Sequence, residues 1–400
     1  MRILILTADS NGGYPVPAVK GGAVSTLIES LVEQNSKEKL VDFTVVSLYS
    51  KEAYKASKKY TNVDFCFVKI PGIIRIFDNL FFNLMGAFKK KAISYKSVFS
   101  LLYYIFFSAV FLRKNSFEKV VLENNVPLSL VIRLSRYKGE YYYHFHNVPR
   151  IDAKCRSVFN KCTKYLCVSN YVASEITSPS SAIGAQDKKR VSVLYNCIDT
   201  GRFRKISGDD RLLYYRKKFG IKKDEKVILF AGRLSEEKGI DVLLQALRHL
   251  KHKNYKVLIV GSVIHNAAYV DDYQKKILAL SVQFKNRIVF TGYINQCDIP
   301  YIYNIADVAV LPSMWDEPAG LTMIEALACG TPVITTRSGG IPEYVGKCAD
   351  VLEIDDDLKK NIADRIDSIF DNPINTNEGI ERVNTYFNKN NYLNNFVKSL

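Results

Sequence analysis

Short runs of aliphatic and β-branched residues alternate with longer amphipathic stretches along the chain. Amphipathic spacing typical of helices is seen in 22–34, 239–250, 272–280 and 321–329. Continuous apolar strands that alternate with helices are typical of parallel sheets covered on both faces. The pattern therefore predicts an α/β fold. The expected strands are Arg2–Thr7, Phe43–Leu48, Val63–Val68, Lys119–Leu122, Tyr141–Phe145, Tyr165–Val168, Val191–Leu194, Lys226–Phe230, Lys256–Val260, Arg287–Phe290, Val308–Leu311 and Pro332–Thr335.

These strands are too many for one doubly wound sheet of usual size. A polar, turn-like stretch at 199–225 interrupts the alternation, and a new strand–turn unit begins after it. We therefore expect two Rossmann-like domains of about 200 residues each. Near the end, Tyr392, Phe396, Val397 and Leu400 form an apolar stripe at helical spacing, which predicts a terminal helix that docks on another element.

Composition and charge narrow the class of protein. The chain has 400 residues, 48% hydrophobic and 24% charged, which excludes disordered and collagen-like proteins. The net charge is +16, and residues 1–200 hold 28 Lys and Arg against 15 Asp and Glu. Because the basic excess belongs to the first half and no nucleic-acid-binding motif is present, we expect no nucleic-acid partner.

The eight cysteines are scattered without a C-x-x-C pair. They are interpreted as buried thiols of a reducing compartment rather than ligands of a metal. The chain begins with a strand-like segment that is too short for a signal peptide, so we expect a cytoplasmic protein.

One apolar stretch, Val98–Leu112, has 15 residues without a charge and is flanked by lysine and arginine. It is shorter than the roughly 20 residues that span a bilayer. It predicts a buried helix packed on a sheet. The alternative is a helix at a bilayer face, with its basic flanks on anionic headgroups. Together with the aromatic residues of 70–84, it makes residues 70–114 a candidate for peripheral membrane association.

Ligands of parallel sheets bind outside the carboxyl ends of the strands, where this chain places glycines and polar groups. Gly21 and Gly22 precede a helix, which suits either a tight turn or the close approach of a diphosphate. Arg233 and Lys238 flank a helix start and are either surface charges or anion ligands. Gly261 follows another strand.

Two histidines, His144 and His146, are expected on one face of a strand end. No carboxylate or cysteine lies near them in sequence, so a zinc site is not expected. His146 is interpreted as a donor to a sugar hydroxyl or phosphate, or as a histidine of the core.

The most specific motif is the segment 315–326, in which Glu317 precedes a predicted helix and Glu325 lies two turns inside it. Eight residues of helix span about 12 Å, which suits the two ends of a nucleotide sugar. The N–H groups of Ala319, Gly320 and Leu321 can meet a diphosphate between them. The alternative is that Glu317 only caps the helix and Glu325 is solvated.

This motif resembles the E-x7-E signature of family 4 of the glycosyltransferases, retaining enzymes of the GT-B fold. The resemblance extends over nearly the whole chain, with a proline-containing segment typical of the spore-coat and capsule polysaccharide branch. It departs from the family at Cys197, where glycine is usual, and at Ala319, where an aromatic residue is frequent. The other matching segments are 20–23, 146–147, 169–170, 196–199, 230–233 with 238–239, and 326–333.

The resemblance implies a GT-B architecture, with two Rossmann-like domains facing across a cleft. It assigns residues 1–200 and 385–400 to an acceptor-binding domain, with the terminal helix returning to it, and 201–384 to a donor-binding domain. It also implies a nucleotide-sugar donor, most commonly a UDP-sugar, and no metal or other cofactor. The acceptor would be a saccharide or lipid-linked saccharide.

The resemblance also implies roles for individual residues. Arg233 and Lys238 would neutralise the diphosphate, Glu325 would bind the ribose, and Glu317 would hold a hydroxyl of the donor sugar. The backbone at Gly21 and Gly22 would approach the phosphate and acceptor, and His146 would help to place the sugar. Catalytic roles are thus expected for His146, Arg233, Lys238 and Glu317. Donor binding is expected for Gly21, Gly22, Arg233, Lys238, Gly261, Glu317, Ala319, Gly320, Leu321 and Glu325.

Two other interpretations remain beside a surface-polysaccharide glycosyltransferase. A nucleotide-sugar isomerase of the 2-epimerase type has the same fold and needs no acceptor. A non-catalytic, membrane-associated scaffold would not need Arg233, Lys238, Glu317 and Glu325 together.

The acidic run 355–357 contains D-x-D, but it is interpreted as a surface turn because no strand–loop–helix site is expected there.

Overall fold

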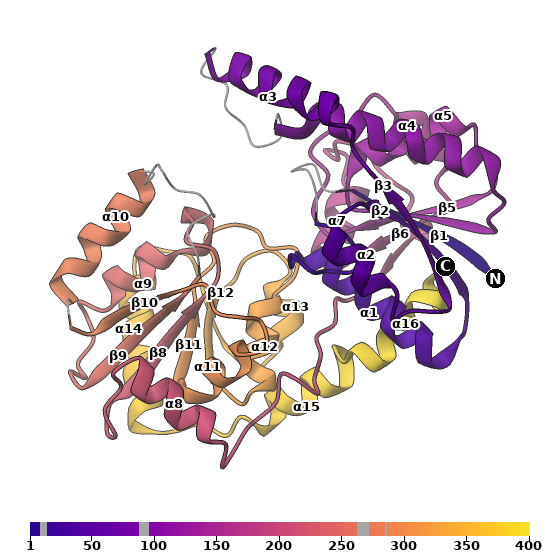
Figure 1. The fold of residues 1–400 in the computed structure, drawn as a ribbon. Helices are drawn as coiled ribbons and strands as arrows, with labels where there is room; N and C mark the ends of the chain where they lie inside the picture. Colours follow the sequence, from indigo (N-terminus) through magenta and orange to yellow (C-terminus); the bar gives the residue numbers. More distant parts are fainter. Residues whose placement is uncertain (9–13, 88–95, 262–271, 285) are drawn as a thin grey trace. The chain divides into compact units, whose positions relative to one another are not determined.

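The computed structural model describes residues 1–8, 14–87, 96–261, 272–284 and 286–400. It consists of two compact units, Met1–Asn196 with Lys389–Leu400 and Cys197–Asn388. Each unit contains one parallel sheet covered by helices, which confirms the α/β fold predicted from the sequence (Figure 1).

The first unit is built on a seven-stranded sheet of order β3-β2-β1-β4-β5-β6-β7. The seven strands expected in the first half of the sequence are all present. Helices α1 to α7 connect successive strands or follow them. The strands are β1 (Arg2–Thr7), β2 (Asp42–Leu48), β3 (Val63–Val68), β4 (Lys119–Glu123), β5 (Glu140–Phe145), β6 (Lys164–Cys167) and β7 (Val191–Val193). The helices are α1 (Ala23–Glu38), α2 (Lys51–Ser57), α3 (Gly72–Ala87), α4 (Val98–Lys114), α5 (Ser129–Ser135), α6 (Arg156–Lys161), α7 (Asn170–Thr177) and the terminal α16 (Lys389–Ser399).

The second unit is built on a six-stranded sheet of order β10-β9-β8-β11-β12-β13. Five of its strands were expected from the sequence, and the short β13 was missed. The strands are β8 (Lys226–Ala231), β9 (Tyr255–Val260), β10 (Ile288–Gly292), β11 (Val308–Leu311), β12 (Val333–Thr336) and β13 (Asp350–Leu352). The helices are α8 (Asp210–Lys218), α9 (Ile240–Ala246), α10 (Asp272–Ser281), α11 (Ile299–Ile305), α12 (Leu321–Ala328), α13 (Ile341–Val345), α14 (Leu358–Asp371) and α15 (Asn377–Tyr386).

The terminal helix α16 packs on α1 of the first unit. Its side chains Tyr392, Leu393 and Phe396 are buried, and the Phe396 ring lies edge-on to Phe43 of β2, with 6.2 Å between the ring centroids. The predicted apolar stripe was wrong in part. Leu393, which was not in the stripe, is buried, whereas Val397 and Leu400 of the stripe are only half-buried.

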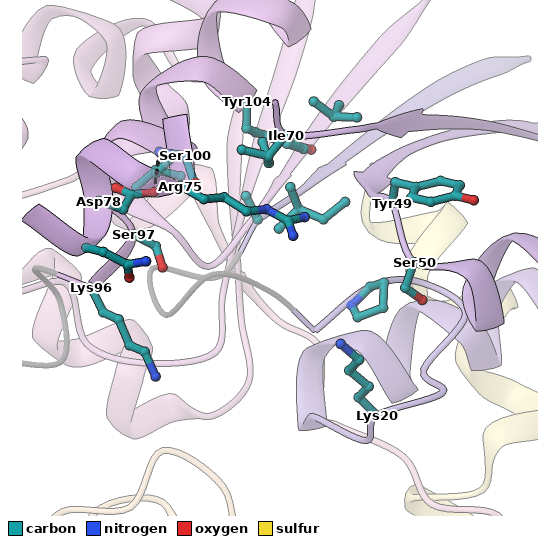
Figure 2. Close-up of a pocket in the computed structure, with 16 residues that line it drawn as sticks. Lys20, Tyr49, Ser50, Ile70, Arg75, Asp78, Lys96, Ser97, Ser100 and Tyr104 are labelled. Carbon is teal, nitrogen blue, oxygen red and sulfur yellow. Dashed lines mark hydrogen bonds between the residues drawn. The ribbon is translucent and has the colours of Figure 1, made fainter. Parts of the chain in front are cut away.

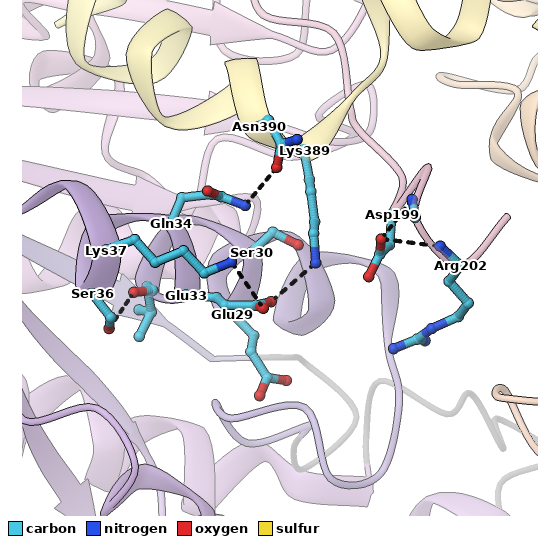
Figure 3. A network of polar contacts seen from close by, with 12 residues as sticks. Glu29, Ser30, Glu33, Gln34, Ser36, Lys37, Asp199, Arg202, Lys389 and Asn390 are labelled. Atoms are coloured by element: carbon cyan, nitrogen blue, oxygen red, sulfur yellow. Dashed lines mark hydrogen bonds and ion pairs between the residues drawn. The ribbon is translucent and has the colours of Figure 1, made fainter. Parts of the chain in front are cut away.

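Polar contacts flank this packing (Figure 3). The carboxylate of Glu33 on α1 forms ion pairs with Lys389 at 3.3 Å and with Lys37 at 3.8 Å. The side-chain amide of Gln34 donates a hydrogen bond to Oδ1 of Asn390 at 3.1 Å. These contacts fix the position of α16 along α1.

The chain passes between the units twice, at 196/197 and 388/389, within a few residues of the boundaries at 200/201 and 384/385 expected from the resemblance. In the second unit, the N–H of Ile198 donates to the carbonyl of Phe387 at 2.8 Å, so the two passing segments are paired there. Because this backbone pairing holds Ile198 and Phe387 together in the second unit, the boundaries lie at 196/197 and 388/389 and not at 200/201 and 384/385. No side-chain pattern in the sequence indicates such a pairing.

Helix α4 is buried on one face, as the packed-helix interpretation of the apolar stretch predicts, and carries exposed apolar residues elsewhere. Tyr104, Ile105 and Leu112 are buried, whereas Leu102 and Phe106 are 49% and 64% exposed. One face therefore packs in the unit and another apolar face is open. Among the helices of the described residues, none is both long and apolar enough to cross a bilayer.

The cysteines are free thiols, and five of them are buried. The expectation that all are buried was wrong for Cys297, which is exposed, and for Cys66 and Cys348, which are only partly covered. Cys297 lies in the loop between β10 and α11, where no sheet face covers it.

Candidate functional site

The strand order of the second unit reverses between β8 and β11, and ligands of doubly wound sheets bind at such a point. The loops that leave these two strands are bonded to each other. Met314 donates its backbone N–H to the carbonyl of Glu237 at 2.8 Å, and a Cβ on Gly239 would lie 2.0 Å from the carbonyl oxygen of Pro312. This close approach brings Lys238 of the first loop beside Glu317 of the second.

Lys238 and Glu317 form an ion pair, with Nζ 2.6 Å from Oε1. Glu317 is buried at 5% exposure, and the loop that carries it is fixed by the N–H of Gly340, which donates to the Glu317 carbonyl at 2.6 Å. Glu317 does not cap α12, whose N-terminal residue Gly320 carries no side-chain cap. The capping interpretation of Glu317 is therefore wrong.

Glu325 lies on α12, one face of which borders a cavity of about 200 Å³. Its carboxylate accepts a hydrogen bond from the hydroxyl of the buried Tyr303 at 3.1 Å. Burial raises the pKa of Glu325 to about 7 against the opposing effects of Tyr303 and Arg202. The cavity is also lined by residues from the loops after β8, β9 and β10. They include Gly232, Gly261, Tyr293, Ile294 and Gln296. Gly292 at the end of β10 and Thr322 of α12 also line the cavity.

A smaller hollow adjoins this cavity and shares Ala231 and Thr322 with it. It is lined by Lys238 and Glu317, so the two predicted acidic residues border neighbouring spaces. Sequence reasoning missed Tyr303, Tyr293 and Thr322. The apolar pattern of 299–305 gave no reason to separate Tyr303 from its neighbours, although the loop after a predicted strand pointed to Tyr293.

The remaining predicted donor residues lie around the same loops. Arg233 is exposed and pairs with Glu237 at 3.2 Å, so a ligand would have to compete with that contact. Leu321 is the first residue of α12, Gly320 is its N-terminal cap and Ala319 directly precedes the cap. Gly261 is required by close packing, because a Cβ there would lie 1.9 Å from the carbonyl oxygen of Gly232.

The other predicted residues belong to the first unit. Gly21 and Gly22 have φ values of 75° and 99°, and Gly22 is the N-terminal cap of α1. A Cβ on Gly22 would lie 2.8 Å from Cγ of Tyr14, so both conformation and space require glycine.

His146 forms a buried cluster with His144 and Glu123. Oε2 of Glu123 lies 2.9 Å from Nε2 of His146 and 3.1 Å from Nδ1 of His144. Burial and the neighbouring His144 lower the pKa of His146 to about 4, so its ring is neutral near pH 7. Burial opposes ionisation of Glu123, but the contacts with the two imidazoles lower its pKa.

The expectation that no carboxylate accompanies the histidines was therefore wrong. Glu123 ends β4, and its backbone pairs in register with His144 of the adjacent β5. The register of two predicted parallel strands was the signal that could have found it. The three side chains offer potential metal ligands within 4.8 Å of one another. Their contacts have hydrogen-bond lengths.

The acidic run Asp355–Asp357 is an exposed turn, where Asp355 accepts the N–H of Asp357 at 3.1 Å. The interpretation as a surface turn agrees with this structure. The accompanying argument was wrong, however, because the turn does connect a strand, β13, with a helix, α14.

The raised pKa of Glu325 predicts a stability effect. Its folded pKa of about 7 exceeds the ordinary unfolded value, so this group stabilises the protein at low pH and the contribution is lost as pH rises towards 7. Glu325→Gln is therefore expected to raise the free energy of unfolding at pH 8 by about 2 kcal/mol relative to the original protein, and by much less at pH 5. Urea unfolding at both pH values measures this difference, with the exposed Glu381→Gln as control. Equal effects of Glu325→Gln at the two pH values would contradict the prediction.

Comparisons with known proteins find similar sequences and folds. Residues 214–386 match the family of glycosyl transferases group 1. The chain is 26% identical over 397 residues to spore coat protein SA of Bacillus subtilis, covering 96% of this chain and 93% of that protein. It is 33% identical over 190 residues to an uncharacterized glycosyltransferase, MJ1607, of Methanocaldococcus jannaschii, covering 47% of this chain and 46% of that protein.

The fold is shared with a solved structure of Alr3699/HepE from Anabaena, a complex with UDP and glucose. The TM-score is 0.73 at 16% identity, and the match covers 100% of this chain and 99% of that one. Residues 214–386 are thus similar to glycosyl transferases group 1, and the whole chain has the two-sheet fold of the GT-B enzymes.

Proposed function

We propose that this protein is a family 4 glycosyltransferase that transfers a sugar, with retention of the anomer, from a UDP-sugar to a saccharide or lipid-linked saccharide in surface polysaccharide synthesis. The observation that carries the proposal is the pair of adjoining hollows at the β8/β11 switch point, one bordered by Glu325 and the other by Lys238 and Glu317. The complex of Alr3699/HepE with UDP and glucose supports the choice of donor.

The proposed donor would occupy the larger hollow and extend beside the smaller one, which has a volume of about 10 Å³. Its nucleoside would lie in the larger one, where Glu325 accepts hydrogen bonds from ribose hydroxyls and Tyr293 and Ile294 line the space for the base. Its sugar would lie beside Glu317, with a hydroxyl donating to the carboxylate. Gly232 and Gly261 line the larger hollow.

The diphosphate would meet Lys238, Arg233 and the N–H groups of Ala319, Gly320 and Leu321. Because negative charge grows on the leaving diphosphate as the glycosidic bond breaks, these groups would stabilise the transition state more than the bound donor. Lys238 already lies against Glu317, so its ammonium group is held in place before a donor binds. No metal is needed for this role in the proposal.

The first unit would bind the acceptor. Gly21 and Gly22 would let the backbone at the start of α1 approach the phosphate and acceptor, and the neutral His146, oriented by Glu123, would help to place the donor sugar. We further propose peripheral association with a membrane through residues 70–114, supported by the open apolar face of α4 and the basic excess of residues 1–200.

The proposed activity predicts the outcome of a donor-alone experiment. Thermal unfolding is first followed with UDP, GDP and a set of UDP-sugars, where a ligand at 100 times its dissociation constant stabilises by about 2.7 kcal/mol. The stabilising UDP-sugar is then incubated without acceptor. We expect only slow release of free sugar and UDP, because no acceptor is present.

The appearance of an epimeric nucleotide sugar would show an isomerase instead of a transferase. The absence of stabilisation by every nucleotide would contradict the donor site. The configuration of the sugar that is released or transferred, followed by NMR, tests retention.

A further inference from the structure

The first unit contains a hollow of its own, with a volume of about 430 Å³, which is distinct from the proposed donor site in the second unit (Figure 2). Its walls come from the loops after β1, β2 and β3 and from the facing ends of α3 and α4. Three cations line it, Lys20, Arg75 and Lys96, and Figure 2 shows Lys20 and Arg75 extending into the space from opposite sides. None of the three side chains forms an ion pair or hydrogen bond with another described residue.

The carboxylate among the described lining residues, that of Asp78, is hydrogen-bonded to the start of α4. Asp78 accepts from the backbone N–H of Phe99 at 2.8 Å, from that of Ser100 at 3.2 Å and from the Ser100 hydroxyl at 2.5 Å. It thereby satisfies the start of α4 instead of pairing with the cations. With Lys20, Arg75 and Lys96 against Asp78, the described lining residues carry a net positive charge, which suits an anion with several oxygens.

An apolar face adjoins the same hollow. On α3, five apolar side chains at helical spacing are between 52% and 63% exposed, beside the exposed polar residues Arg75, Asn79 and Asn83. They are Ile73, Ile76, Phe77, Leu80 and Leu84. The buried residue of this helix is the acidic Asp78, the reverse of an ordinary surface helix.

The apolar face continues on α4. Phe99 lies against two rings of α3, with centroid distances of 6.1 Å to Phe77 and 5.7 Å to Phe81, and Leu102 and Phe106 of α4 are exposed beyond it. Exposed apolar surface of this extent marks an interaction site. Arg75, which lines the hollow, belongs to α3 itself, so the cationic and apolar features share one helix.

We infer that the hollow binds the phosphate or diphosphate head group of a membrane-anchored acceptor lipid, while the exposed face of α3 and α4 lies in the bilayer surface. A soluble phosphate ester would need the cations but not the apolar face, and a neutral lipid would need the face but not the cations. Their combination on adjoining elements favours a lipid with an anionic head group. This inference rests on the proposed function for the identity of the bound lipid as the acceptor.

The first test compares two vesicle types. One is phosphatidylcholine carrying geranylgeranyl diphosphate, and in the other phosphatidylglycerol supplies the same surface charge. The full-length protein is expected to bind the diphosphate vesicles at least tenfold more tightly. Lys96→Gln is expected to remove about tenfold of that affinity, because it deletes one charged contact to the head group.

The matched control is Lys114→Gln at the other end of α4, since Lys114 is exposed and does not line the hollow. It is expected to lower binding to both vesicle types equally and slightly. Equal losses for Lys96→Gln and Lys114→Gln, or no preference for diphosphate vesicles, would overturn the inference in favour of general surface charge.

The second test separates a lipid from a soluble anion. Leu80→Gln is expected to weaken vesicle binding severalfold and to leave the affinity for inorganic pyrophosphate unchanged, because Leu80 belongs to the apolar face and not to the hollow. Unchanged vesicle binding in Leu80→Gln would show that the ligand is not membrane-anchored and would overturn the inference. Unchanged thermal unfolding midpoints show that the variants fold. Stabilisation by UDP, measured separately, reports on the donor site of the other unit, so failure of one proposal is distinguishable from failure of the other.

Discussion

Glu325→Ala is expected to reduce the affinity for UDP about a hundredfold. In the proposed site the carboxylate accepts two ribose hydroxyls, and hydrogen bonds to a charged group each contribute about 1.5–3 kcal/mol. The carboxylate borders the 200 Å³ cavity and is held by Tyr303, so it is oriented before the nucleotide arrives. Calorimetric titration at pH 8 measures the loss, since Glu325, with its pKa of about 7, is ionised there.

The control for this prediction is Glu381→Ala, on the exposed face of α15 in the same unit. It removes the same charge and is expected to leave UDP affinity unchanged. Below pH 7 the original protein should also bind UDP more weakly, because protonation of Glu325 removes its capacity to accept both hydroxyls as an anion. A Glu325→Ala protein that binds UDP normally would show that the nucleotide lies elsewhere.

Lys238→Ala is expected to lower kcat by about a thousandfold, the second large effect. Removing a preorganised charge at a developing anion typically has an effect of 10²–10³ on the rate. The change also leaves the buried Glu317 without its partner 2.6 Å away, which destabilises the loop before α12. Steady-state release of UDP from the donor, with saturating UDP-sugar, measures the loss.

Two further variants separate the roles in that prediction. Lys360→Ala, on the exposed face of α14, is the control for the loss of a lysine. Lys238→Ala combined with Glu317→Gln removes the unpaired charge, and we expect it to recover stability but not kcat. Recovery of kcat in the double variant would show that Lys238 acts only by holding Glu317 and not on the diphosphate.

The strands of both sheets could be predicted because their apolar runs are continuous and are bounded by turn residues. Strand β13 could not, because its three residues include Asp350 and carry too short an apolar signal. Helix α3 was not predicted either, although its apolar signal is long. Its apolar residues are spaced as in a helix, but they face outward, and Asp78 faces inward.

The candidate site was predictable as a set of residue types at strand ends, but not as a set of contacts. Residues 317 and 325 were found from their spacing, with Glu317 before a predicted helix and Glu325 within it. The pairing of Lys238 with Glu317 depends on two loops 79 positions apart that meet because β8 and β11 are neighbours. Likewise, Glu123 reaches the histidines only through the register of β4 and β5.

The docking of α16 has a consequence for biosynthesis. The first unit needs Leu393 and Phe396, which are fully buried beside α1 and β2, yet the whole second unit lies between these residues and Asn196. On the ribosome, the N-terminal half will therefore emerge with a hydrophobic groove open to chaperones until segment 389–400 has been translated. The part of the protein that is made first is the last to be completed.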